Sequence, residues 1–443
     1  MGLVLWHWFL LLFTLVSSSW SLNSDALALL ALSKNLILPS SISSSWNASD
    51  RTPCEWRGVL CDRNTNVFSL DLSSSGVSGS LGPEIGLLKY LVVLTLLNNS
   101  ISGAIPPELG NCSIMLDQLD LSDNSLSGEI PESLGNLKKL SWLALYSNSL
   151  DGEIPEWLFK NQFLQDVYLH QNNLSGHIPS SVGQMTSLRS LWLHENGLSG
   201  VLPDSIGNCT KLEELYLLDN QLSGSLPKSL SLASGLKVLD ATGNSLTGEI
   251  DFHFENCKLE IFILSFNNQL RGEIPSWLEN CSSLTEFALV NNSFSGHIPA
   301  SLGLLSNLTY LLLSQNSLSG AIPPEIGNCR SLLWLELDTN MLVGSVPKEL
   351  ANLRKLQKLF LFSNFLSGVI PADLGVNSRL LHIDFSNNSF TGGIPPYICS
   401  GKRLKVLHLG FNLLTGSIPS DVADCPSLER LMLQNNYLTG PIP

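Results

Sequence analysis

The sequence has little charge, and most of that charge is negative. Charged residues make up 14% of the 443 residues, and 38 acidic against 24 basic side chains leave a formal net charge of -14. An acidic surface repels phosphate backbones and anionic headgroups, so we expect neither nucleic acid nor an anionic membrane as a partner. A cationic peptide or a basic protein surface suits this charge better.

Catalytic motifs are also missing from the sequence. No Ser/His/Asp or Cys/His set can be argued from it, and the glycines belong to a repeat rather than to a phosphate-binding loop. The sequence therefore predicts no enzyme, no cofactor and no metal site. His170, His194 and Glu195 come nearest to a set of metal ligands, but no fixed fourth ligand or second shell accompanies them.

The chain begins without a single charged side chain. Met1–Ser24 contains no Lys, Arg, Asp or Glu, and Leu3–Val16 is almost wholly apolar. This run is shorter than the ~20 residues that a membrane span needs. The small residues Ser17–Ser19 follow it, as they do at a signal-peptidase site. We interpret residues 1–22 as a signal peptide that lacks a basic n-region; an apolar helix packed on the domain is the alternative.

One pattern recurs along the rest of the chain: Leu-x-Leu-x-x-Asn-x-Leu-x-Gly-x-Ile-Pro. Its Asn position runs from Ser75, which replaces Asn in the first copy, to Asn436. Fifteen steps span 361 residues, so the period is about 24 residues and 16 copies occupy residues 67–443. A single copy cannot bury its own leucines, so neighbouring copies must stack to share a continuous core.

Each part of the pattern has a physical role. Leu-x-Leu predicts a short strand with its leucines inward and its other side chains outward. The Asn amide can satisfy backbone groups of the next turn and form an internal ladder. Gly permits a special backbone conformation, and Ile-Pro favours an extended segment. The sequence thus predicts a curved horseshoe, with parallel strands on its concave face and irregular or 3-10 segments on its convex face.

Two copies depart from this pattern. One has an extra residue between Leu264 and Gly272, which predicts a bulged turn. The copy before it has Ala241 in place of a core leucine and Asp251 in place of proline. For that copy we expect locally weak packing.

The nine cysteines fall into distinct groups. Cys54 and Cys61 stand apart in a polar stretch before the repeats, and one disulfide can close that small loop. Six others share one phase of the repeat and are expected to be small buried hydrophobes: Cys112, Cys209, Cys257, Cys281, Cys329 and Cys425. Only Cys257 and Cys281 occupy adjacent copies, so other pairings within this set would need implausible reach.

Asn-x-Ser/Thr sequons are frequent, as on a glycosylated extracellular surface. They occur at Asn47, Asn98, Asn111, Asn173, Asn208, Asn280, Asn291, Asn307 and Asn387.

The outward strand positions display side chains on a regular grid, where we expect a ligand to bind. Copies four to seven are rich in aromatics there, and exposed aromatics are favoured binding anchors. In this part we predict binding by Tyr146, Tyr168, His170, Trp192, His194, Glu195, Tyr216 and Asp219. Mutual shielding by cross-strand stacking is the alternative. His170 and His194 share a column, about 5 Å apart, and are expected to titrate at mildly acidic pH.

A second group of outward residues occupies copies twelve to sixteen. It comprises Glu336, Asp338, Phe360, Phe362, Asp384 and Arg430. Carboxylates beside aromatics suit a basic peptide. A solvated, mixed-charge face is the competing interpretation.

Several stretches together resemble plant leucine-rich-repeat receptor kinases. These are the export signal, the cap at Leu22–Leu30, the Trp56-x-Gly-Val-x-Cys stretch and the 24-residue repeats. The entry at Ser21–Leu30 and the stretch Ile394–Cys399 with Gly401 and Lys402 are most similar to the receptors for Pep danger peptides. The resemblance implies a leucine-rich-repeat solenoid in which residues 23–66 form the helical N-terminal cap.

The same resemblance implies a function. Such ectodomains bind a secreted peptide along the inner face, a co-receptor with a shorter ectodomain joins near the C-terminal end, and a serine/threonine kinase lies across the membrane. It also suggests that Arg430 holds a peptide carboxylate. We therefore expect a cell-surface receptor involved in defence or developmental signalling. A wall-associated protein that binds a folded partner, such as a foreign hydrolase, is the alternative.

The sequence departs from that family at its end. It stops at Pro443 inside a repeat and contains no capping Cys pair, no membrane span and no His-Arg-Asp or Asp-Phe-Gly motif. An uncapped solenoid end exposes core leucines. We therefore expect a fragment of a longer receptor, or a secreted product if the truncation is natural.

Overall fold

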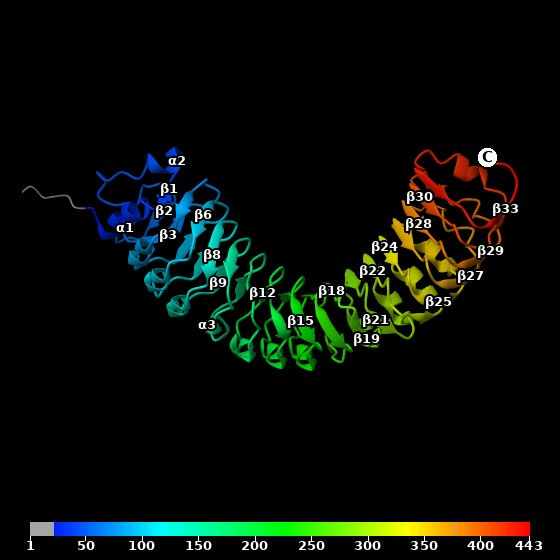
Figure 1. The fold of residues 1–443 in the computed structure, drawn as a ribbon, viewed down its shortest axis with the longest axis horizontal. Coiled ribbons are helices and arrows are strands. Elements are labelled where there is room, and N and C mark those ends of the chain that lie inside the picture. The colour runs from blue at the N-terminus through cyan, green and yellow to red at the C-terminus, as the bar shows by residue number, and fades with distance from the viewer. Residues whose placement is uncertain (1–21, 377) are drawn as a thin grey trace, which may run out of the picture.

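The computed structural model describes residues 22–376 and 378–443, so nearly all of the expected signal peptide lies outside the described residues. The described chain is a crescent of stacked turns, with the N-terminal cap at one tip and Pro443 at the other (Figure 1). The predicted leucine-rich-repeat solenoid is confirmed. No described helix is long and apolar enough to cross a membrane.

The concave face is one continuous parallel sheet with a single strand from each copy (Figure 1). Its strands are β3 (Val67–Asp71), β5 (Val93–Thr95), β7 (Gln118–Asp120), β9 (Trp142–Ala144), β11 (Asp166–Tyr168), β12 (Ser190–Trp192), β14 (Glu214–Tyr216), β16 (Val238–Asp240), β18 (Ile261–Ile263), β20 (Glu286–Ala288), β22 (Tyr310–Leu312), β24 (Trp334–Glu336), β26 (Lys358–Phe360), β28 (His382–Asp384), β30 (Val406–His408) and β32 (Arg430–Met432). The middle residue of nearly every strand is buried, whereas its neighbours point into the hollow.

A second set of short parallel strands follows the ladder Asn on the outer flank. These strands are β4 (Ser78–Ser80), β6 (Ser100–Gly103), β8 (Ser125–Glu129), β10 (Ser149–Asp151), β13 (Ser199–Val201), β15 (Gln221–Gly224), β17 (Ser245–Gly248), β19 (Gln269–Glu273), β21 (Ser293–Ser295), β23 (Ser319–Gly320), β25 (Met341–Gly344), β27 (Phe365–Val369), β29 (Ser389–Thr391), β31 (Thr415–Gly416) and β33 (Tyr437–Leu438). These strands form four separate small sheets, which were not predicted.

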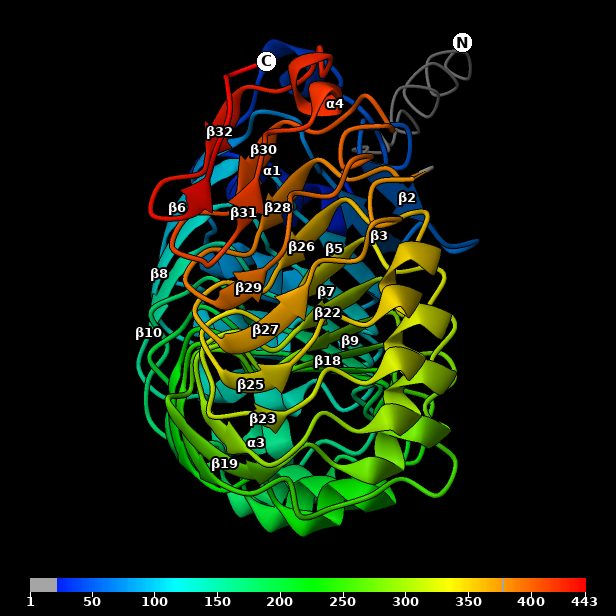
Figure 2. The same cartoon turned by 90° about the vertical axis from the view of Figure 1, so that its right-hand side faces the viewer.

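The convex side consists of one short turn in most copies, and these turns stack along one side of the molecule (Figure 2). The 3-10 turns are η1 (Pro83–Leu87), η2 (Pro107–Asn111), η3 (Glu132–Asn136), η4 (Ser180–Gln184), η5 (Asp204–Asn208), η6 (Lys228–Leu232), η7 (Ser276–Asn280), η8 (Ala300–Leu304), η9 (Pro324–Asn328) and η10 (Lys348–Asn352). Two copies have a short α-helix instead: α3 (Glu156–Phe159) and α4 (Ser420–Ala423).

The cap closes the first copy. It contains α1 (Ser24–Leu32), α2 (Ser40–Ser43), β1 (Leu36–Ile37), which pairs antiparallel with β4, and β2 (Val59–Cys61), which pairs antiparallel with β3. Asn23 caps α1 by accepting a hydrogen bond from the amide of Ala26. Cys54 and Cys61 are bridged as predicted, with their Cα atoms 5.3 Å apart.

The predicted asparagine ladder is present. Asn172 Nδ2 donates to Leu145 O at 3.0 Å in the preceding copy, and its Oδ1 accepts from Leu150 N at 2.9 Å. The same pattern recurs at Asn220 and Asn340. Because the side chain replaces hydrogen bonds that water would otherwise make, the backbone of each turn can be buried.

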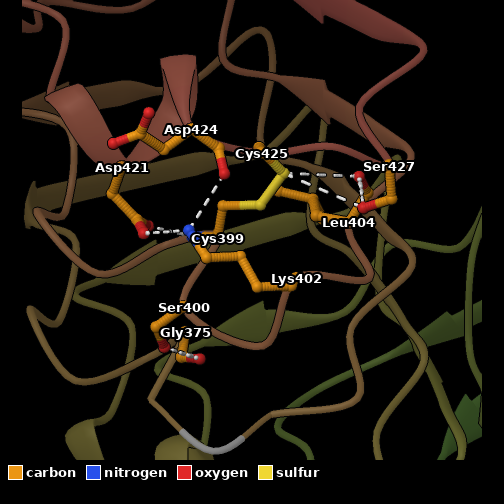
Figure 3. The surroundings of a disulfide bond; sticks show 9 residues. All are labelled: Gly375, Cys399, Ser400, Lys402, Leu404, Asp421, Asp424, Cys425 and Ser427. Carbon is orange, nitrogen blue, oxygen red and sulfur yellow. Dashed lines mark hydrogen bonds and ion pairs between the residues drawn. A yellow bond between two sulfur atoms is a disulfide. The ribbon is translucent and has the colours of Figure 1, made fainter.

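The buried-hydrophobe role expected for six cysteines is wrong for three of them. Cys257 and Cys281 form a disulfide, and Cys425 pairs with Cys399, where Asp421 accepts from Cys399 N at 2.6 Å (Figure 3). The buried-hydrophobe role holds only for the three free and buried members of the set, namely Cys112, Cys209 and Cys329.

In the copy with Ala241, that alanine is fully buried. Phe252 and Phe254 of the same copy are also buried and lie within 6 Å of the Trp277 ring, so this copy contributes an aromatic cluster to the core. The neighbouring extra residue does form a bulged turn: Phe266 and Asn268 both have positive φ, +57° and +63°.

Candidate ligand-binding face

Seven outward-facing rings form the centre of the candidate site, and we call them the aromatic strip. The strip consists of Trp142, Tyr146, Tyr168, His170, Trp192, His194 and Tyr216. Its strands run from the left arm to the base of the crescent, where they line the hollow (Figure 1). The structure thus brings together the aromatic residues that the sequence predicts for copies four to seven.

One row of the strip consists of rings on paired strands. Register places Tyr168 beside Trp192 and Trp192 beside Tyr216. Their ring centroids lie 5.0 Å and 4.8 Å apart in edge-to-face contact. Trp192 Nε1 also donates to Glu214 Oε2 at 3.0 Å. These contacts fix the ring orientations, so the row is organised before any ligand arrives.

The other row is a face-to-face stack. Tyr146 and His170 lie 4.6 Å apart at an interplanar angle of 6°, and His170 and His194 lie 4.2 Å apart at 15°. The expected side-by-side histidines are therefore confirmed. Both Nδ1 atoms are buried without a hydrogen-bond partner.

The expected titration of His170 is wrong. Only 8% of this residue is exposed, and burial, with a smaller contribution from His194, lowers its pKa to about 4. Burial also lowers the pKa of His194, while the carboxylates of Glu195, Asp240 and Asp219 act in the opposite direction. His170 thus stays neutral at mildly acidic pH.

Carboxylates surround the far end of the strip. Glu195 accepts from Gln171 Nε2 at 3.2 Å, and Asp219 is exposed on the next turn. Burial raises the pKa of Asp240, and burial together with the Asp240 charge raises the pKa of Glu286. Each shift means that the negative form is poorly compensated, which favours the approach of a cation.

Sequence reasoning missed the role of Glu214, Asp240 and Glu286. They occupy first or third positions of β14, β16 and β20, the same outward positions as the aromatic residues. The repeat register is a sufficient signal for these positions, which lie in copies seven, eight and ten.

The second predicted group lies along the right arm of the crescent (Figure 1) and is less open than expected. Asp338 is only 5% exposed and accepts from Ser314 Oγ at 2.6 Å, so it is a buried structural residue and not an open ligand contact. Asp384 lies 3.1 Å from His408 Nδ1. Glu336 and Phe360 are half-buried and adjacent in register, whereas Arg430 is exposed.

Other residues of the second group pack on one another. Phe362 contacts Phe360 at 6.3 Å between ring centroids. Lys358 Nζ lies 3.4 Å from the centre of the Trp334 ring, a cation–π contact. Only part of this group is therefore available to a ligand.

The sequons lie mostly at the surface: the predicted asparagines are exposed except Asn291, which is half-buried. Among the described residues, no group of three or more His, Cys, Asp or Glu side chains is arranged to hold a metal ion.

Comparison with known proteins gives two matching family models. The leucine rich repeat N-terminal domain matches residues 22–62. The Leucine Rich Repeat model matches residues 90–112, 115–137, 163–185, 187–209, 211–232, 307–329, 379–400 and 403–425.

Individual relatives include plant receptor kinases. A segment of 85 residues is 52% identical to the leucine-rich repeat receptor-like protein kinase PEPR1 of Arabidopsis thaliana; it covers 18% of this chain and 8% of that protein. The solved PEPR1–AtPEP1 structure is 44% identical with a TM-score of 0.81, covering 95% of this chain and 66% of that one. The solved structure of the Arabidopsis receptor kinase HAESA, in complex with the peptide hormone IDA and the co-receptor SERK1, is 31% identical with a TM-score of 0.55. The match covers 95% of this chain and 87% of the HAESA chain. This chain thus spans just under two thirds of the solved PEPR1 chain.

Proposed function

The chain belongs to the leucine-rich-repeat ectodomains of plant receptor kinases, and on that premise we propose that it binds a secreted, basic peptide along its concave face. The region described here is a non-catalytic ectodomain. The PEPR1 and HAESA structures contain AtPEP1 and IDA, respectively, and their likeness to this chain supports a peptide as the ligand class.

The observation that carries the proposal is the aromatic strip. Aromatic side chains on an open sheet face are costly unless a partner covers them, and Tyr and Trp contribute heavily to binding energy. Here their orientations are already fixed by ring contacts and by the Trp192–Glu214 hydrogen bond. A ligand therefore loses little free energy in ordering the site.

Charge supports a basic ligand. Asp240 and Glu286 lie beyond the aromatic row, and both carboxyls have raised pKa values because of burial. Asp240 already accepts from Thr242 N at 3.0 Å, and a ligand ammonium or guanidinium placed there would add an ion pair to each carboxylate. The net charge of -14 would also speed the encounter with a cationic peptide.

Further parts of the proposal follow the relatives. We propose that an export signal in residues 1–22 directs the protein to the cell surface, and that the whole protein carries a kinase. A co-receptor such as SERK1, which is present in the HAESA complex, would join the peptide-bound ectodomain. Defence or developmental signalling would be the outcome.

The test is a titration of the secreted ectodomain with synthetic AtPEP1 and with a scrambled peptide of the same composition. Replacing Tyr168, Trp192 and Tyr216 together by Ala should weaken AtPEP1 binding by more than about 2 kcal/mol. The matched control replaces Leu87, Leu232 and Leu304, three convex apolar residues that are at least 56% exposed, and should leave affinity unchanged. Equal losses in both triple variants would contradict the proposal, as would equal binding of the scrambled peptide.

A further inference from the structure

The stack of convex turns is interrupted between η3 and α3. In seven copies a glycine lets the next turn approach closely: a Cβ on Gly110 would overlap the backbone oxygen of Ser133, and one on Gly207 that of Ser229. At Gly135 the nearest neighbour is instead the indole of Trp157, 2.9 Å from such a Cβ. The backbones of the two turns are therefore held apart by a side chain.

The reason lies in the sequence of the following copy. Trp157 takes the place that Ser133, Ser205 and Ser229 have in other copies, where the glycine of the preceding turn meets the backbone. The segment forms α3 rather than a 3-10 turn. An indole at this stacking position keeps the two backbones farther apart than a serine does.

The gap contains a cavity of about 310 Å³ on the outer side of the crescent, where α3 is labelled in Figure 1. Its lining includes Lys138, Trp157, Lys160, Asn161, Gln162 and Phe163. Phe163 is 53% exposed, so much of its ring is accessible to a ligand. Lys139 Nζ lies 5.3 Å from the centre of the Phe163 ring and adds a third ammonium group.

These groups match one ligand chemistry. A pyranose ring presents an apolar C–H face that can pack on Phe163, while the Gln162 amide can exchange hydrogen bonds with hydroxyls. Asn161 Oδ1 accepts from Phe163 N at 2.8 Å, so Asn161 offers its Nδ2 group as a donor. Ammonium groups on flexible stems attract carboxylates as point charges. An aromatic ring, amides and cations in one cavity thus suit a sugar that carries acid groups.

The lysines are available for such a ligand. Lys138 donates to Gly135 O at 2.5 Å, and Lys160 pairs with Glu156 at 3.1 Å with both side chains more than half exposed. Exposed pairs of this kind contribute about 0–1 kcal/mol, so a carboxylate can replace them at little cost. The overall acidity of the chain matters less here, because salt screens charges beyond about 8–10 Å.

We propose that this cavity binds an acidic oligosaccharide built from uronic acid units. The site is independent of the peptide face: it lies on the convex side, it is basic rather than acidic, and none of its lining residues belongs to the aromatic strip. One ectodomain would then contact both a soluble basic peptide and an anionic polysaccharide of its surroundings.

The test is calorimetric titration of the folded ectodomain with a de-esterified oligogalacturonate, and with the same oligomer after methyl esterification. The variant Lys138→Gln/Lys160→Gln should weaken oligogalacturonate binding about tenfold, equivalent to ~1.4 kcal/mol. Phe163→Ala should weaken binding of the acidic oligomer by a similar factor, because it removes the ring on which the sugar packs. The esterified oligomer should bind wild type at least about tenfold more weakly.

The matched control, Lys211→Gln/Lys355→Gln, removes the same charge from exposed positions elsewhere on the solenoid and should change affinity less than about twofold. If the control variant lost as much oligogalacturonate affinity as Lys138→Gln/Lys160→Gln, binding would depend on the overall surface charge and not on this cavity, and the proposal would be overturned. Equal binding of the two oligomers, or no binding by wild type, would also overturn it. Unchanged AtPEP1 affinity and secretion of the variants would show that they fold and that the two sites are separate.

Discussion

Replacing Asn220 by Ala tests the ladder that holds the solenoid together. Asn220 is 9% exposed, and its Nδ2 donates to Leu193 O, Leu217 O and Leu218 O at 3.0, 3.1 and 3.3 Å. Its Oδ1 accepts from Leu198 N at 3.0 Å. Alanine removes all four contacts and leaves backbone groups of two adjacent copies unsatisfied.

The magnitude follows from the bonding capacity of the amide. Its two hydrogens serve three carbonyl acceptors, so with the Oδ1 bond the side chain supplies about three full hydrogen bonds. At about 1 kcal/mol each, Asn220→Ala should lower the free energy of unfolding by about 3 kcal/mol. Gln221→Ala, at the exposed neighbouring position, should change it by less than about 0.5 kcal/mol.

Two measurements check this prediction. Chemical denaturation gives the free energy of unfolding, and hydrogen exchange reports the Leu198 amide directly. Asn220→Ala should speed exchange at Leu198, whereas amides several copies away should stay protected, because each copy contacts mainly its neighbours. If Leu198 exchanged at the wild-type rate, the ladder would not be the stabilising element that we infer.

Three further predictions concern titration and the cap. Because burial lowers the pKa of His170 to about 4, against about 6.5 in the unfolded chain, the unfolded state takes up this proton first and acid destabilises the fold. Chemical denaturation at pH 7 and pH 5 measures how much unfolding free energy wild type and His170→Phe each lose on acidification. His170→Phe should lose up to about 2 kcal/mol less than wild type. An identical loss in wild type and variant would contradict the lowered pKa of His170. Because burial raises the pKa of Asp240, its charged form destabilises the fold above that pKa and the penalty disappears as pH falls. Asp240→Asn should therefore raise the melting temperature at neutral pH while weakening AtPEP1 binding, and a lowered melting temperature would show that the carboxylate is compensated. Cys54→Ser/Cys61→Ser removes a bridge worth about 2–5 kcal/mol and should secrete poorly, whereas Cys112→Ala, at a free buried cysteine, should secrete nearly normally; mass mapping that found both cap thiols free in secreted wild type would refute this.

The fold was predictable because each repeat makes the same local choices. The period, the ladder asparagine and the inward leucines follow from side-chain alternation and from the need to satisfy buried amides. Burial of individual outward residues was not predictable in this way. Asp338 and His170 occupy outward positions but are covered by neighbours whose size and rotamers a single repeat does not reveal.

The cysteine pairs show a similar limit. Cys257 and Cys281 are one period apart, so their pairing was within reach of the repeat argument. Cys399 and Cys425 are separated by 26 residues and fall at different phases, which concealed their proximity. The cavity beside α3 was hidden for another reason, because one Trp in place of Ser changes the spacing of two turns without changing the period.

The central claim is that a peptide lies along the concave face, and photo-crosslinking tests it most directly. AtPEP1 carrying a photoreactive phenylalanine at successive positions would be irradiated with the secreted ectodomain, and the cross-linked residues mapped by mass spectrometry. We predict cross-links along the inner strands from β9 to β20, in the order of the peptide positions, with the aromatic strip included. Cross-links confined to the convex turns or to the outer flank at β25 and β27 would contradict the account.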